Sequence, residues 1–174
     1  MNVRRATMSD LEDILSVYAA ARIYMSEHEN PTQWGASYPP VELVVSDIEG
    51  GLSWVITDIC PSEDKETVLG VFAFLPDGDP IYNNIEGKWL NDLPHAAIHR
   101  VASSGKRRGI LGACIDFCIS RSDNLKIDTH RDNITMQNAL KKQGFVACGR
   151  IFLENGEDRI AYQRVVSDSG RSRY

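Results

Sequence analysis

The sequence lacks several features that would assign it to particular classes of protein. No apolar run approaches the roughly 18 residues that a membrane-spanning helix needs. The first residues, Met-Asn-Val-Arg-Arg, lack the apolar core of a secretory signal. The four cysteines do not have the paired spacing of a zinc site. We therefore expect a cytoplasmic protein with reduced cysteines, no metal and no membrane partner.

Two common phosphate-binding patterns are also absent. There is no G-x-x-x-x-G-K-[S/T] loop, and Gly105, Gly109 and Gly112 are not spaced as in the dinucleotide pattern G-x-G-x-x-G. The net charge of −5 argues against a nucleic-acid partner. This charge is uneven, since the first 97 residues hold 5 Lys and Arg against 16 Asp and Glu, and the rest hold 14 against 8. The second part therefore favours an anionic ligand and the first part a cationic one.

The length of 174 residues predicts a single α/β domain over 1–166 and a flexible tail over 167–174. Periodic apolar residues predict strands at 2–6, 52–60, 67–75, 96–102, 125–129, 145–153 and 159–166, and helices at 9–24, 41–48, 109–120 and 134–143. A capping box from Ser9 to Glu12 marks the first helix start. The stretches 27–40 and 76–93 are expected to be irregular. A strand–helix–strand crossover among mostly antiparallel strands predicts a mixed sheet.

The most informative segment is the basic turn, which we define as Gly105 to Gly109. The apolar strand before it ends at Ala102, three cations follow Gly105 together, and Gly109 opens an apolar helical pattern. The N–H groups at a helix start have no partner inside the helix, and they lie at the positive end of its dipole. With the adjacent cations, this turn is a candidate seat for a diphosphate.

Two motifs resemble those of the GNAT superfamily of acyl-CoA-dependent N-acyltransferases. The first family pattern is Arg or Gln, two residues, Gly, one residue, then Gly or Ala, and it reads here from Lys106 through Gly109 to Leu111. Lys106 and Leu111 depart from it. The second pattern is Asn, a helix and Gly-Phe, which reads here from Asn133 to Gly144-Phe145. Trp34, Tyr38-Pro39 and Ile98-His-Arg are also similar to a bacterial subgroup of this superfamily.

The resemblance implies a sheet with a splayed parallel strand pair, and acetyl-CoA as the acyl donor. It implies an N-acetyltransferase that moves the acetyl group to a primary amine of a small molecule or a protein, by direct attack in a ternary complex. The strand before the turn would bind the pantetheine arm through its backbone, the turn would bind the diphosphate, and Asn133 would steady the arm. The implied coenzyme-binding residues are Val101, Ala102, Lys106, Arg107, Arg108, Gly109, Ile110, Leu111 and Asn133.

Acetyl transfer requires proton removal from the amine, stabilisation of the oxyanion and protonation of the leaving thiolate. The resemblance gives the oxyanion task to the Val101 N–H. The tyrosine that many family members place seven residues after the asparagine is Leu140 here. Four other residues are candidate proton carriers, each with an ordinary structural role as the alternative: His99, Tyr82, Glu86 and His130.

Leu111 and Leu140 keep a second hypothesis open. The chain would then be a catalytically weak or inactive acyl-CoA-binding regulatory module. A nucleotide-binding protein outside this superfamily is a third interpretation, and homodimerisation is left open. The sequence does not identify the acceptor.

Overall fold

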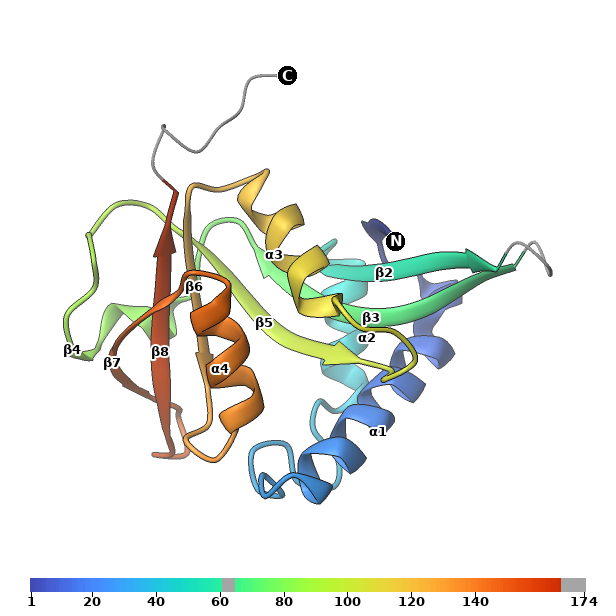
Figure 1. Ribbon diagram of the computed structural model, residues 1–174, viewed down its shortest axis with the longest axis horizontal. Coiled ribbons are helices and arrows are strands. Elements are labelled where there is room, and N and C mark those ends of the chain that lie inside the picture. The colour runs from blue at the N-terminus through green and yellow to red at the C-terminus, as the bar shows by residue number, and fades with distance from the viewer. Residues whose placement is uncertain (61–64, 167–174) are drawn as a thin grey trace. The chain divides into compact units, whose positions relative to one another are not determined.

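The computed structural model describes residues 1–60 and 65–166 (Figure 1). The tail expected over 167–174 lies outside the described residues. The chain divides into two compact units, each made of two segments. Unit 1 comprises Met1–Phe74 and His99–Ile115, and unit 2 comprises Leu75–Ile98 and the chain from Asp116 onward.

Unit 1 is built on antiparallel strands with two helices packed on them. Its elements are β1 (Asn2–Arg5), the 3-10 helix η1 (Met8–Asp10), α1 (Leu11–Glu27), α2 (Val41–Glu49), β2 (Ser53–Cys60), β3 (Lys65–Leu75), the second part of β5 (Ala96–Ser103) and the first part of α3 (Ile110–Ile119). β1 pairs with β2, and β2 with β3, both antiparallel. Figure 1 shows β2 and β3 as two long neighbouring arrows.

The core of unit 1 follows from the spacing of apolar residues on α1. Ile14, Val17, Tyr18 and Ala21 recur at intervals of three or four and are buried, so they lie on one helix face. They form one cluster with Val44 and Ile48 of α2 and with strand residues such as Val55 and Val71. The two helices therefore cover one face of the unit 1 strands.

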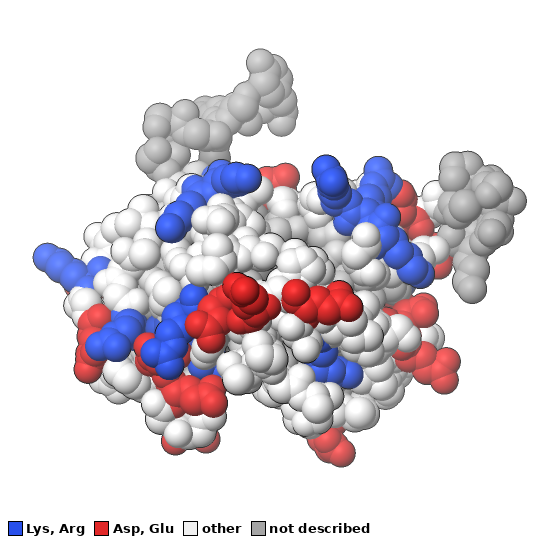
Figure 2. Space-filling model, turned by 60° about the horizontal axis from the view of Figure 1, so that its bottom comes forward, with Lys and Arg blue, Asp and Glu red and all other residues white. Residues whose placement is uncertain are grey.

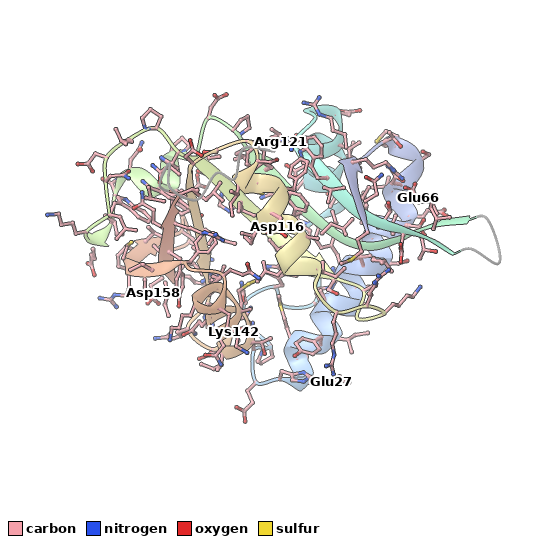
Figure 3. All side chains as sticks on the ribbon, turned by 45° about the horizontal axis from the view of Figure 1, so that its top comes forward. Glu27, Glu66, Asp116, Arg121, Lys142 and Asp158 are labelled. Atoms are coloured by element: carbon pink, nitrogen blue, oxygen red, sulfur yellow. The ribbon has the colours of Figure 1, made fainter. Side chains whose placement is uncertain are left out.

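The first helix is capped two residues earlier than the sequence predicts. Asp10, rather than Glu12, supplies the carboxylate, and its Oδ2 accepts from the Thr7 N–H at 2.8 Å and the Thr7 hydroxyl at 2.9 Å. The reason is the 3-10 turn at Met8–Asp10, which precedes α1. Arg4 donates two hydrogen bonds to Asp10 and three to Glu66, whose position Figure 3 labels. The hydrogen bonds from Arg4, added to those from Thr7, lower the pKa of Asp10 to about 2.

Unit 2 contains the parallel strand pair that the sequence predicts. Its elements are the first part of β5, the 3-10 helix η2 (Pro80–Asn83), β4 (Glu86–Gly87), the second part of α3, β6 (Asn124–Thr129), α4 (Ile134–Lys142), β7 (Val146–Phe152) and β8 (Asp158–Val165). The strand order is β5-β6-β8-β7-β4. β5 runs parallel to β6 from Ala96↔Leu125 to Ile98↔Ile127, and the other pairs are antiparallel. The expected mixed, mostly antiparallel α/β fold is confirmed.

The stretch 76–93 is more ordered than its sequence indicates, since it contains η2 and β4. β4 pairs with β7 at a point where two glycines face each other, Gly87 and Gly149. A Cβ on either glycine would overlap the backbone of the opposite strand. This close approach explains why a strand of two residues forms here. In the part of the chain that the structure describes, no helix is long and apolar enough to cross a membrane.

Candidate functional site

The basic turn in unit 1 is shaped by serines and glycines. The Ser103 hydroxyl accepts from the Gly105 N–H at 3.2 Å, and the Ser104 hydroxyl accepts from the Lys106 N–H at 3.4 Å. Gly105 and Gly109 have φ angles of +75° and +89°, in the left-handed region that glycine adopts most easily. The chain can therefore reverse tightly between β5 and α3.

The start of α3 presents backbone donors. The first hydrogen bond at this end runs from the Ala113 N–H to the Gly109 carbonyl oxygen at 3.0 Å. The N–H groups of Ile110, Leu111 and Gly112 thus precede the first intrahelical bond. Three N–H groups at the positive end of the helix dipole favour an anion. Leu111 is half-buried at this position.

Ile110 fixes the helix start against β3. Its side chain is buried and lies directly over Gly70, because a Cβ at Gly70 would overlap the Ile110 Cγ2 methyl and lie 3.0 Å from the Ala102 carbonyl oxygen. The Ser104 N–H donates to the Leu69 carbonyl oxygen of β3 at 2.9 Å. Both ends of the turn are therefore anchored on the same strand.

The three cations of the turn are not equivalent. All are exposed, but Arg107 forms an ion pair with Asp58 of β2. No such ion pair is recorded for Lys106 or Arg108 within the described residues. Figure 2 shows acidic and basic side chains in mixed clusters on the face that it presents. Arg107 is thus partly neutralised by Asp58, while the charges of Lys106 and Arg108 remain directed at the solvent around the turn.

The second part of β5 carries an unusual backbone at Arg100. Its φ is +53°, a conformation that costs a residue with a side chain about 1–2 kcal/mol. Arg100 Nε donates to Asp47 Oδ2 at 2.8 Å, and its Nη2 donates to Oδ1 at 2.9 Å. The Arg100 side chain is 12% exposed and that of Asp47 8%. The paired and desolvated guanidinium of Arg100 therefore stabilises β5 at the residue whose backbone is irregular.

Aromatic side chains surround this ion pair. Burial opposes the charge of Arg100, but the Asp47 carboxylate and the Tyr38 hydroxyl outweigh it and raise the pKa of Arg100. Burial also raises the pKa of Tyr18 far above its usual value. Trp34 packs edge-on against Tyr18, with ring centroids 5.7 Å apart. Sequence reasoning missed the ion pair because its partners are 53 residues apart.

In unit 2, Tyr82 and Asp128 form a hydrogen-bonded pair. The Tyr82 hydroxyl donates to Asp128 Oδ2 at 2.8 Å, and Tyr82 is 1% exposed. The indole N–H of Trp89 donates to the Tyr82 carbonyl oxygen at 3.0 Å. Tyr82 was a sequence candidate, whereas Asp128 was not. This tyrosine is therefore buried against a carboxylate rather than solvated in a loop.

The alternation of polar residues along β6 is the sequence feature that could have identified Asp128. Along β6, Asn124, Lys126 and Asp128 occupy every second position, so the three side chains lie on one face. Lys126 is buried with its ammonium 3.9 Å from the centroid of the Trp89 ring, and burial lowers the pKa of Lys126. A strand with polar residues at every second position, all half-buried or buried, is uncommon for ordinary packing.

His130 and Asn133 lie together at the start of α4. His130 Nδ1 accepts from the Asp132 N–H at 3.2 Å, and the ring is largely buried. Asn133 Oδ1 accepts from the Met136 N–H at 3.0 Å, so Asn133 is the N-cap of α4. The side chain that was expected to steady a coenzyme arm also stabilises a helix start.

Glu86 has a different setting from Tyr82 and His130. Its side chain is 60% exposed and accepts from Arg150 Nη2 at 2.8 Å. Arg150 also lies near Asp158, whose position Figure 3 labels. His99 is half-buried on β5 in unit 1. The described residues contain no group of three or more His, Cys, Asp or Glu side chains placed to hold a metal ion.

Comparisons with known proteins bear on this site. No protein-family model matches the chain, and no curated protein matches its sequence significantly. Among solved structures, it is similar to a GNAT-family acetyltransferase from Streptococcus agalactiae, with 26% identity, 96% of each chain covered and a TM-score of 0.83. A structure described as an acetyltransferase from Staphylococcus aureus has 23% identity, 96% and 100% coverage and a TM-score of 0.67. The NatC complex bound to Gag peptide and CoA shares 12% identity over 95% and 98%, with a TM-score of 0.60.

These likenesses cover nearly the whole chain and agree with the mixed sheet and its parallel strand pair. The fold is that of an acetyltransferase. The chain's fold matches that of the GNAT-family acetyltransferases, as its two motifs indicate.

Proposed function

We propose that this protein is an N-acetyltransferase that moves the acetyl group of acetyl-CoA to a primary amine by direct attack in a ternary complex. The observation that carries the proposal is the turn between β5 and α3. It combines three backbone donors at a helix start with the exposed cations Lys106 and Arg108. This is the chemistry that a diphosphate requires.

The residues of the turn fit acetyl-CoA as a substrate. The N–H groups of Ile110, Leu111 and Gly112 would bind diphosphate oxygens, while Lys106 and Arg108 would neutralise their charge. The left-handed Gly109 leaves the approach to these donors without a Cβ.

The oxyanion task falls to the Val101 N–H. The Ser104 N–H bonds to β3, and the Ala102 carbonyl oxygen lies near Gly70 of β3. The left-handed φ of Arg100 interrupts the regular alternation of the strand just before Val101, so in this proposal the backbone angles of Arg100 set the direction of the Val101 N–H. A donor at this position can stabilise negative charge on the thioester oxygen as the amine nitrogen attacks its carbon.

Proton transfer needs a group that receives the amine proton and a group that protonates the thiolate when the C–S bond breaks. Tyr82 is a candidate acid, because its hydroxyl is ordered by Asp128. His130 is a second candidate, because its largely buried ring lies beside Asp132 at the start of α4. His99 remains the candidate on β5. The exposed, ion-paired Glu86 is the weakest of the four.

The acceptor is a primary amine of a small molecule or a protein. A groove of about 880 Å³ lies in unit 2, beside η2 and the turn between β7 and β8. Asp79 and Glu154 contribute carboxylates to its wall, and Phe152 and Ile81 contribute apolar surface. An ammonium with an apolar neighbour suits this lining.

The alternative is an acyl-CoA-binding module without catalysis. Leu140 favours it, because this residue is fully buried in unit 2 and provides no proton donor. Incubating the protein with acetyl-CoA and a panel of polyamines, amino acids and lysine peptides separates the two hypotheses. Thiol release that depends on an added amine supports the transferase, and tight binding without any release supports the module.

The coenzyme itself is tested by calorimetric titration with acetyl-CoA, CoA and ATP. We expect micromolar binding of acetyl-CoA and CoA and much weaker binding of ATP. The double variant Lys106→Glu, Arg108→Glu should lose at least about tenfold in affinity, because it places like charge beside the diphosphate. The matched control is Lys141→Glu, Lys142→Glu on α4, which makes the same charge change at exposed residues elsewhere. Equal affinity in the two double variants would refute the assignment of the turn.

A further inference from the structure

The ion pair between Arg100 and Asp47 has a role beyond stability. We propose that Asp47 is a positioning residue, which holds Arg100 in its left-handed conformation and thereby sets the direction of the Val101 N–H. This inference rests on the proposed function, in which that N–H polarises the thioester carbonyl. Neither residue contacts the reacting atoms in this proposal. Both act through the backbone of β5.

The first step of the argument is geometric. The peptide group between Arg100 and Val101 contains the Val101 N–H, so the dihedral angles of Arg100 determine where that N–H points. A φ of +53° at Arg100 turns this peptide away from its direction in a regular strand. A change at Arg100 to an ordinary extended conformation would therefore redirect the proposed oxyanion donor.

The second step concerns what maintains this conformation. Arginine has no intrinsic preference for positive φ, unlike glycine or asparagine. The conformation is instead accompanied by two charge-assisted hydrogen bonds, of 2.8 and 2.9 Å, to a carboxylate that is itself almost fully buried on α2. The bidentate geometry fixes both the distance and the orientation of the guanidinium. Asp47 on α2 thus stabilises the φ angle of Arg100 in β5.

The third step separates positioning from coenzyme binding. The basic turn is anchored on β3 through Ser104 and Ile110, and neither anchor involves Asp47. Loss of the ion pair should therefore change the environment of the thioester carbonyl while the affinity for acetyl-CoA stays nearly constant. A purely structural ion pair would not produce this separation.

The test uses two double variants that both lack the ion pair. Asp47→Asn with Arg100→Ala leaves residue 100 with a Cβ and no reason to be left-handed. Asp47→Asn with Arg100→Gly leaves a residue that adopts the left-handed region at little cost. Because both partners are replaced, neither variant contains a buried unpaired charge, and we expect each to be more stable than the single variants at Asp47 or Arg100.

The readout is the infrared stretch of the carbonyl in acetyl-CoA labelled with carbon-13 at the acetyl C1, recorded in the complex. Donation by the Val101 N–H lowers this frequency from its value in buffer. We expect the wild-type shift to be retained in the glycine variant and lost in the alanine variant, with dissociation constants that agree within about threefold. The variant Asp10→Asn, which disrupts the partly buried ion pair between Arg4 and Asp10 in unit 1, controls for general destabilisation and should keep the full shift.

Each outcome has a distinct meaning. Equal shifts in the alanine and glycine variants, whether both are retained or both are lost, would overturn the positioning role. Failure of the wild-type protein to bind acetyl-CoA would instead refute the proposed function, and this inference with it. Binding without any carbonyl shift in the wild type would remove the Val101 N–H as the donor while leaving the coenzyme assignment intact.

Discussion

The contact between Gly70 and Ile110 permits a quantitative prediction about the variant Gly70→Ala. Gly70 has no positive φ, so alanine fits its backbone, and the effect comes from the added methyl group. That methyl would overlap Ile110 Cγ2 and crowd the Ala102 carbonyl oxygen. Overpacking of this kind costs about 1–3 kcal/mol, and the less flexible unfolded chain offsets about 0.4–1 kcal/mol of it. We expect a net loss of about 1–2 kcal/mol.

Chemical denaturation and calorimetry measure this loss, and each kcal/mol should lower Tm by about 2–4 °C for a chain of this size. The second readout is affinity for acetyl-CoA, which should fall because Ile110 is the first residue of α3. A double-mutant cycle with Ile110→Ala provides the control. Ile110→Ala alone leaves a cavity and costs about 2–5 kcal/mol, but it removes the methyl that clashes. The double variant should therefore lose less stability than the sum of the single variants, and an additive cycle would refute the close approach.

Three further predictions concern other named contacts. Arg4 lowers the pKa of Asp10 to about 2, so the stability from this pair is fully present above the unfolded pKa near 4 and is lost as the pH falls towards about 2. Asp10→Asn should remove that part of the acid-denaturation profile, and an unchanged profile would contradict the assignment. Asn133→Ala should destabilise the protein by about 0.5–2 kcal/mol through loss of the α4 cap, measured by urea unfolding, and no loss would mean that the cap contributes nothing. Tyr82→Phe should cost about 1.5 kcal/mol in the same unfolding assay, because a hydroxyl no longer donates to the Asp128 carboxylate. A loss below about 0.5 kcal/mol would contradict this contribution.

The features that could be predicted from the sequence are those with local signals. The parallel pair of β5 and β6 follows from a strand–helix–strand pattern, and the turn before α3 from a run of cations beside Gly109. The hairpin of β7 and β8 follows from Asn155-Gly156 between two apolar strands. In each case the residues that determine the structure are close in sequence.

The features that could not be predicted depend on contacts between distant residues. Arg100 in its strand looks like any polar strand residue, and only its pairing with Asp47 shows why its backbone differs. From the sequence, Gly70 is only a residue of low strand propensity. Its packing role follows from the structure, in which the Ile110 side chain lies over it. Glu86 was a candidate because of its loop position, but the pairing of β4 with β7 leaves it exposed beside Arg150.

The division of each unit into two chain segments has a consequence for how the protein is made. Unit 1 closes only after His99–Ile115 has been added to Met1–Phe74. A chain emerging from the ribosome must therefore extend through the whole of Leu75–Ile98 before β3 gains its neighbour in β5. During that interval β3 presents an open edge, which is the kind of surface that pairs with other chains. This open edge of β3 is therefore present before the basic turn has been synthesised.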